Sequence, residues 1–187
     1  PYTDLAWFYL LTNRPDEALK VLNEGKAWTS DTEGSYYYLY QAMAYMELKQ
    51  YDKAKEIFEK MFIYYPYFID LYNIYSRYLL ETEQLDKADE TLQRPLLYNP
   101  NDPVFLITKA RILTARGKLD EAIAIGEQAR KMEIDEFPYV HYYLAEAYRV
   151  AGQLEKARQE YQKVIQINPV CHLASLALDQ LKAIREK

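Results

Sequence analysis

Hydrophobic and polar residues follow a helical period along this chain, and the pattern recurs about every 34 residues. Five alanines each follow a polar, turn-like segment, and each lies twelve residues after another small residue. The pairs are Ala6 and Ala18, Ala42 and Ala54, Ser76 and Ala88, Ala110 and Ala122, and Ala145 and Ala157. Two helices approach closely only where both contribute small side chains, so the constant offset predicts five similar helical hairpins. A repeat of this length indicates a stacked helical array.

Local signals bound the helices of each hairpin. An acid stands two residues before each repeat alanine, where unpaired amides and the helix dipole favour negative charge. The second helices are therefore expected to begin near Asp16, Asp52, Asp86, Asp120 and Glu155. Just before these starts, Asn13, Gly117 and Gly152 tolerate the left-handed conformation that ends a first helix, whereas Lys49 and Glu83 fit it less well. The uneven spacing of the units predicts connectors within 23–34 and 131–138.

At this level of detail the units resemble tetratricopeptide repeats. Numbered from Ser35, a repeat of that family has a bulky aromatic residue at position 4, small residues at 8 and 20, aromatic residues at 11 and 24, and proline at 32. Residues 35–68 supply Tyr38, Ala42, Ala54, Tyr45, Phe58 and Pro66. Residues 138–171 match except that His141 replaces the bulky aromatic, and the other three units match at fewer positions.

The resemblance implies an all-α, right-handed superhelical solenoid of about five hairpins. We expect one array over 1–187, with repeats 1–34, 35–68, 69–102, 103–137 and 138–171 and a capping helix at 172–187. That last helix is expected because Leu173, Leu176, Leu181 and Ile184 form an apolar stripe, and a terminal repeat needs a polar outer face. Two departures fall in the middle of the array: Pro95 should kink or shorten its helix, and Gly126 stands where a large core residue is usual.

A ligand-binding surface is the second implication of the resemblance. In tetratricopeptide proteins, positions 2, 5, 9 and 12 of the first helices line a concave groove that binds peptides. The candidate groove residues here are Trp7, Tyr36, Leu39, Met43, Met46, Asn73, Arg77, Ile107, Arg111, Tyr139, Tyr142 and Arg149. The carboxylate clamp that some members carry is absent, since Leu39, Met43, Ile74, Val104 and Thr108 occupy its positions.

Three arginines stand out among these candidates. Arg77 has Glu81 four residues on, and Arg149 has Glu146 three residues back, so both can form ordinary surface ion pairs. Arg111 has no acid at either spacing. We therefore expect Arg111 to be the least satisfied of the three and to contact a partner's carboxylate or carbonyl, with Tyr139 and Tyr142 as apolar anchors.

Charge and composition narrow the classes of function. The chain has 187 residues and a net charge of −5, which disfavours nucleic acid as a partner. No apolar run is long enough to span a membrane, and no catalytic or phosphate-binding motif is present. Cys171 is the single cysteine, and His141 and His172 have no acid at metal-ligand spacing, so we expect no metal, no cofactor and no enzyme activity.

Three functional hypotheses follow. The first is an adaptor whose groove binds a protein or peptide. The second is a structural module that assembles with copies of itself, and the third is an accessory domain of a larger enzyme. The chain begins with proline rather than methionine, so we expect a fragment or a processed product, and the compartment stays open although a cytoplasmic protein is slightly favoured.

Overall fold

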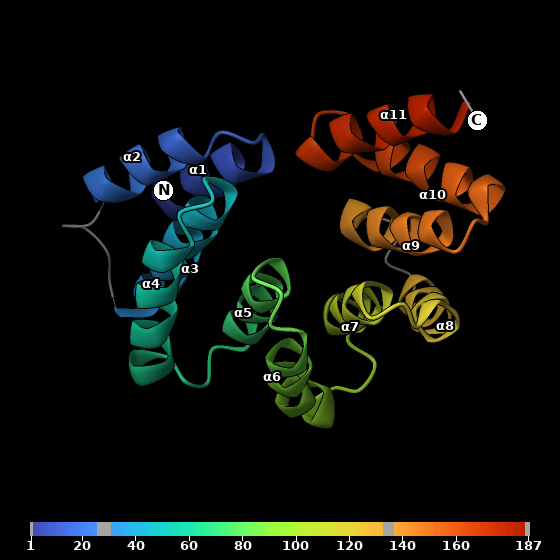
Figure 1. The fold of residues 1–187 in the computed structure, drawn as a ribbon. Coiled ribbons are helices and arrows are strands. Elements are labelled where there is room, and N and C mark those ends of the chain that lie inside the picture. The colour runs from blue at the N-terminus through green and yellow to red at the C-terminus, as the bar shows by residue number, and fades with distance from the viewer. Residues whose placement is uncertain (1, 26–30, 133–136, 186–187) are drawn as a thin grey trace. The chain divides into compact units, whose positions relative to one another are not determined.

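The computed structural model describes residues 2–25, 31–132 and 137–185, and every regular element in these ranges is an α-helix (Figure 1). The helices are α1 (Tyr2–Leu11), α2 (Pro15–Gly25), α3 (Asp31–Glu47), α4 (Tyr51–Tyr64), α5 (Ile69–Glu81), α6 (Leu85–Tyr98), α7 (Pro103–Ala115), α8 (Leu119–Arg130), α9 (Pro138–Val150), α10 (Leu154–Ile167) and α11 (His172–Arg185). The all-α prediction and the eleventh helix are confirmed. Each second helix begins one residue before its predicted acid.

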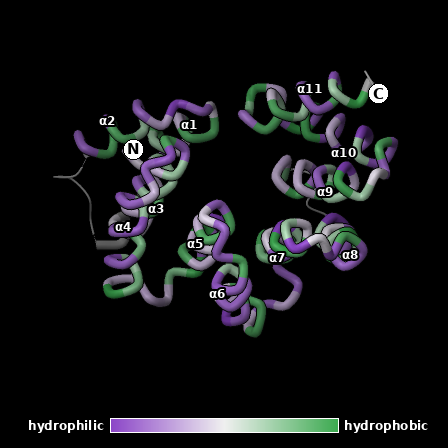
Figure 2. Tube along the Cα trace, viewed as in Figure 1, coloured by the Kyte–Doolittle hydropathy of each residue, from purple (hydrophilic) through white to green (hydrophobic). Residues whose placement is uncertain are grey.

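The chain divides into two compact units, Pro1–Tyr78 and Leu79–Lys187, called unit 1 and unit 2 below. The boundary falls inside α5. In unit 1, α1 packs on α2 and α3 on α4, and in unit 2 α7 packs on α8, α9 on α10, and α11 on α10. Hydrophobic and hydrophilic residues alternate along the helices of both units, as an amphipathic pattern requires (Figure 2).

The small residues that carry the repeat lie in the core. All ten residues of the five pairs are at most 1% exposed. Methyl-sized side chains let helix backbones approach one another, so this burial explains why the offset of twelve is kept.

All five hairpins turn in the same way. The second residue after each first helix has a positive φ, between 56° and 75°, and Lys49 (59°) and Glu83 (61°) adopt this conformation as Asn13, Gly117 and Gly152 do. In each hairpin the next amide donates to the carbonyl five residues earlier, as from Gln50 N to Tyr45 O over 2.8 Å. This is the Schellman pattern, and its hydrogen bonds hold Lys49 and Glu83 in a conformation that their side chains disfavour.

The structure corrects two local predictions and explains a third feature. Both ends of the predicted connector 23–34 are helical, since α2 extends to Gly25 and α3 begins at Asp31, and residues 26–30 and 133–136 of the two predicted connectors lie outside the described residues. The helix containing Pro95 is not shortened: α6 has 14 residues, as α4 and α10 do. Pro95 lies in the last turn of α6, so a bend at that point would displace only the few residues that follow it. At Gly126 an added Cβ would lie 2.8 Å from Leu144 Cδ1, so the Leu144 side chain of α9 occupies the space that a larger residue would need.

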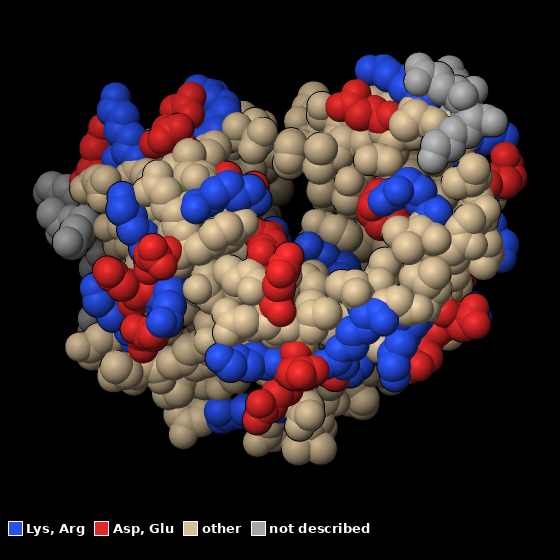
Figure 3. All heavy atoms as spheres, viewed as in Figure 1, with Lys and Arg blue, Asp and Glu red and all other residues tan. Residues whose placement is uncertain are grey.

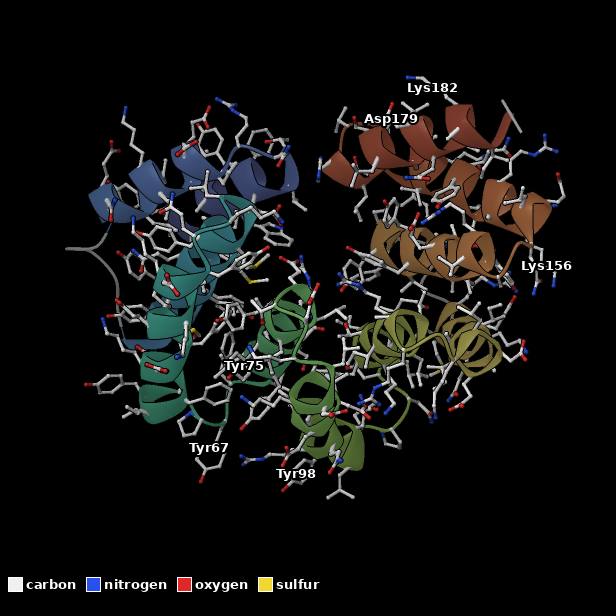
Figure 4. The ribbon with its side chains drawn as sticks, viewed as in Figure 1. Tyr67, Tyr75, Tyr98, Lys156, Asp179 and Lys182 are labelled. Atoms are coloured by element: carbon white, nitrogen blue, oxygen red, sulfur yellow. The ribbon has the colours of Figure 1, made fainter. Side chains whose placement is uncertain are left out.

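Unit 2 ends in the expected terminal helix. Ala174 and Ala177 of α11 are fully buried, and Leu173, Leu176 and Ile184 pack against the unit 2 core. Asp179 and Lys182 lie on the outer side of α11 and pair over 3.2 Å (Figure 4).

Candidate protein-binding surface

The candidate residues divide into those with open side chains, meaning at least partly exposed to solvent, and those with buried side chains. Position 9 is at least partly open in every repeat, as at Trp7, Met43 and Arg111, but the residues at positions 5 and 12 are mostly buried. The buried candidates are Leu39, Met46, Asn73, Ile107 and Tyr142.

The open side chains of α3 and α9 follow positions 2, 6 and 9. Position 6 holds Tyr40 in α3 and Tyr143 in α9, and neither was a candidate from the sequence. A stripe at 2, 6, 9 and 13 lies about 50° round the helix from one at 2, 5, 9 and 12, at 100° per residue. The i, i+4 spacing from position 2 was the available signal for these two tyrosines.

In unit 1 the open surface is an aromatic row formed by Trp7, Tyr40, Tyr36 and Phe68. Trp7 of α1 stacks on Tyr40 of α3, with ring centroids 5.4 Å apart and planes 23° from parallel. Tyr36 lies 5.7 Å from Tyr40 and meets Phe68, just before α5, edge to face at 4.9 Å. Trp7 is 40% exposed and Tyr36 is 41% exposed, so these rings are presented to solvent as well as to each other.

Two carboxylates accompany this aromatic row. The Tyr36 hydroxyl donates to Asp70 Oδ2 over 3.3 Å. Burial, followed by the charges of Tyr36, Asp70 and Asp4, raises the pKa of Tyr40 to about 12. The aromatic row is therefore an apolar surface in a negative electrostatic environment.

In unit 2 the open surface centres on Arg111 of α7. Its guanidinium carbon lies 3.8 Å from the ring centroid of Tyr143, and its Nη1 donates to the Tyr139 hydroxyl over 2.8 Å. The expectation that Arg111 is the least satisfied arginine is wrong, because two tyrosines of α9 hold it. Sequence spacing could not reveal this contact, since Tyr139 follows Arg111 by 28 residues.

The other two arginines, Arg149 and Arg77, both lie near an acidic side chain. Arg149 pairs with Glu146 as expected, through Nη2 at 2.7 Å and Nε at 3.2 Å, and the Tyr161 hydroxyl also donates to Glu146. Arg77 Nη2 lies 3.9 Å from Glu47 Oε1 of the preceding first helix, a pair that the sequence spacing did not suggest.

Unit 2 also contains a buried polar cluster that the sequence did not reveal. His141 Nδ1 lies 2.6 Å from Glu160 Oε2, and both residues are under 10% exposed. Nearby, the Tyr148 hydroxyl and Arg130 both donate to Glu127, and Arg130 Nε is 3.9 Å from Glu160 Oε1. Hydrogen bonds satisfy these groups, as buried polar atoms require. Within the described ranges no three His, Cys, Asp or Glu residues are placed to hold a metal ion, and Cys171 is buried.

Exposed apolar side chains gather where the second helices end. In unit 1 these are Ile63, Tyr64 and Tyr67, and in unit 2 they are Leu97 and Tyr98, all more than 70% exposed. Figure 4 shows Tyr67 and Tyr98 pointing away from the helices. Exposed aromatic and aliphatic side chains in such number are typical of contact surfaces.

Charge is mixed on the face shown in Figure 3, where basic and acidic side chains lie side by side over both units. Such a surface offers no continuous basic field for a phosphate backbone. Among the described residues, no helix combines the length and hydrophobicity that crossing a membrane requires.

Comparisons with known proteins agree on one family. Two family models, both described as tetratricopeptide repeat, match residues 45–112 and 138–169, which together make up just over half of the chain. A comparison with curated protein sequences gives no significant match.

Several solved structures have a similar fold. A thermophilic TPR protein of Thermus thermophilus is 19% identical, with a TM-score of 0.80 over 100% of this chain and 98% of that one. YrrB, described as a TPR protein with an unusual peptide-binding site, is 25% identical, with a TM-score of 0.52 over 96% of this chain and 91% of that one. A chain of the APC/C hetero-tetramer Cut9–Hcn1 is 15% identical, with a TM-score of 0.70, and this chain covers 33% of it.

Proposed function

Because the chain belongs to the tetratricopeptide repeat family, a fold that generally serves as a protein-binding scaffold, we propose that it binds a protein or peptide on the open side of its first helices. The observation that carries the proposal is the pair of open surfaces on these helices, the aromatic row of unit 1 and the Arg111 surface of unit 2. Tryptophan, tyrosine and arginine are the residues most enriched at the energetic centres of protein interfaces.

The Arg111 surface supports a polar contact in particular. The two tyrosines hold the guanidinium through one N–H and one ring face, and the charge of Glu81 also acts on it. Its remaining N–H groups suit a carboxylate or a carbonyl of the ligand. Tyr143 takes the role of anchor that the sequence suggested for Tyr142, because Tyr142 is buried.

The test is selection of ligands from a library of random peptides displayed on phage, with the whole chain as bait. The Arg111→Ala variant should weaken binding of the peptides that use unit 2 by about 1 kcal/mol or more, the scale of one charge-assisted hydrogen bond. Its melting temperature should change little. Arg158→Ala is the matched control, since the Arg158 side chain is 42% exposed on the second helix α10 and pairs with Glu155 three residues back. A library that gives no ligand at all would count against the scaffold function.

Self-assembly is a second candidate, and the exposed apolar residues at the ends of the second helices favour it. Sedimentation at several protein concentrations separates the two functions, because an adaptor stays monomeric. If the chain associates, Tyr67→Ser and Tyr98→Ser should return it to a monomer. We propose no catalysis by this chain: repeat proteins of this family are typically non-catalytic scaffolds, and no catalytic family matches.

A further inference from the structure

We propose that the aromatic row of unit 1 binds arginine side chains from a basic segment of a protein partner. This inference rests on the proposed scaffold function and specifies the chemistry of one of its contacts. It is carried by the exposure of the rings, by their mutual packing and by the charge around them.

The row is a preformed platform rather than a set of single exposed rings. Tyr40 contacts both Trp7 and Tyr36, and Tyr36 also contacts Phe68, so each ring is supported by a neighbour. Trp7 and Tyr36 nevertheless leave about two-fifths of their surface open. Stacked, supported rings lose little conformational entropy when a ligand covers them, which favours their use in binding.

Two acids from different helices act on the platform. Asp70 of α5 accepts the hydrogen bond from Tyr36, and Asp4 belongs to α1, three residues before Trp7. Both carboxylates act on the Tyr40 hydroxyl, whose pKa is raised by burial first and then by its neighbours Tyr36, Asp70 and Asp4. The carboxylates therefore lie where they attract a cation that approaches the rings.

Arginine fits this combination better than lysine. Its planar guanidinium stacks on an aromatic face while its edge donates two parallel hydrogen bonds to a carboxylate, whereas an ammonium is a compact, strongly hydrated charge. The chain makes the same kind of contact internally. In unit 1 Arg14 lies 4.6 Å over the Tyr9 ring, and in unit 2 Arg111 lies 3.8 Å over Tyr143.

The experiment measures binding of three fluorescently labelled peptides to the whole chain by anisotropy. One peptide alternates arginine with serine, one lysine with serine, and one glutamate with serine, all of one length. We expect the arginine peptide to bind at least about tenfold more tightly than the glutamate peptide at about 150 mM salt, with the lysine peptide between them. Equal affinity for the arginine and glutamate peptides would overturn the proposal, and so would a preference for lysine.

Variants then locate the contact. Trp7→Leu should lower the affinity for the arginine peptide at least about fivefold, and so should the double variant Asp4→Asn with Asp70→Asn. Trp7→Tyr should retain most of the affinity. The matched control is Glu24→Gln with Glu56→Gln, which removes the same charge from exposed sites on the second helices α2 and α4. An equal loss in the control means diffuse attraction to an acidic protein, and that result would refute a site at the row.

Failure of this inference can be told apart from failure of the scaffold function. If the displayed library gives peptide ligands that lack arginine and still bind the Trp7→Leu variant, the scaffold function stands and the arginine site does not. If the library gives no ligand and the arginine peptide does not bind, the scaffold function and the arginine site are both refuted.

Discussion

Units 1 and 2 are built on the same hairpin but are held together by different side chains. Unit 1 packs aromatic rings against one another: Phe58 is fully buried and contacts Tyr75 and Tyr78, each at 5.2 Å between ring centroids. In unit 2, aliphatic residues and alanines around Ile107 and Leu144 share the core with buried tyrosines such as Tyr161, and buried or half-buried carboxylates are bonded to basic and phenolic groups. The small residues at the repeat positions therefore determine the backbone geometry, whereas the other side chains between the helices differ from unit to unit.

The difference has consequences for stability. The packing of uncharged rings does not change as the pH falls, whereas a carboxylate bonded to a basic or phenolic group stabilises the fold only while it is charged. Unit 2 is therefore expected to respond to acid and to loss of a single polar partner. The stability of unit 1 is expected to depend more on substitutions that change the volume of a buried side chain.

The largest predicted effect is on ring packing. Phe58→Ala should lower the free energy of unfolding by about 3 to 5 kcal/mol, because it leaves a cavity among buried rings. Phe58→Leu, which fills most of that space, should cost clearly less. Denaturant unfolding measures both, and a cost for Phe58→Ala below about 1 kcal/mol would show that unit 1 does not depend on this packing.

The same variant tests whether the chain is one domain. We propose that repeats 1–187 form one cooperative array, since the boundary between the units falls within the continuous helix α5. Hydrogen exchange resolved by segment should then show Phe58→Ala accelerating exchange in α9 and α10 as well as in α3 and α4. Acceleration confined to unit 1 would mean two independent domains.

The next effect is loss of a buried acid in unit 2. Glu160→Gln removes the charge opposite His141, so the free energy of unfolding should fall by about 2 to 3 kcal/mol. The control is Glu155→Gln on the same helix, whose exposed pair with Arg158 should contribute nothing measurable. Equal effects of the two substitutions would remove the contrast between the units.

Low pH should reveal a difference in stability between the two units without any mutation. Burial raises the pKa of the Glu127 carboxyl, but hydrogen bonds from Tyr148 and Arg130 outweigh it and leave the pKa lowered. The pKa of Asp89 is lowered in the same way by Lys109 and Arg116. A depressed folded pKa contributes stability above the unfolded value, and that stability is lost as the pH falls through the folded pKa. From the ordinary glutamate value of 4.5 downward, exchange should therefore rise first in unit 2.

Alkali supplies the control for this acid experiment. The pKa values of Tyr40 in unit 1 and Tyr142 in unit 2 are both raised to about 12, chiefly by burial. A raised folded pKa gives stability that is complete below the unfolded value, near 10, and is lost as the pH rises toward 12. Both units should weaken together in that window. The pH dependence below 4.5 should be smaller in Glu127→Gln, and an unchanged acid profile in that variant would contradict the assignment to this carboxyl.

The sequence predicted what depends on local spacing. Small residues twelve apart, acids at helix starts and the apolar stripe of the last helix act within one hairpin, and the helices they predicted are present. Contacts between successive hairpins were not accessible in this way. Arg111 with Tyr139 and Glu127 with Tyr148 join residues 28 and 21 apart, and side-chain choice rather than spacing determines such pairs.

The candidate surface shows the same limit. The exposed positions lie a fraction of a helical turn away from the predicted groove positions. The reason is that packing against the neighbouring hairpin determines which side of each first helix is buried. Tyr40 and Tyr143 were missed for that reason, and the peptide-binding role of the candidate residues stays a prediction. Pro95 is a different case: it lies in the last turn of α6, where a bend displaces only the few residues that follow, so the helix keeps its length.

The smallest predicted effect concerns the turn that both units share. Lys49 in unit 1 and Glu83 in unit 2 hold φ angles of 59° and 61°, a conformation that costs a residue with a Cβ about 1 to 2 kcal/mol. Glycine removes this strain but gains more freedom in the unfolded chain, so Lys49→Gly and Glu83→Gly should each stabilise the protein by about 0.5 to 1 kcal/mol. Lys49 also lies 5.8 Å over the Tyr51 ring, so its substitution loses a weak contact and should give the smaller gain. Lys60→Gly, in the helical interior of α4, should instead destabilise by about 1 kcal/mol. Similar gains in the two units, measured by denaturant unfolding, would place their difference in side chains alone, whereas a gain in only one would mean that the hairpin turns are not equivalent.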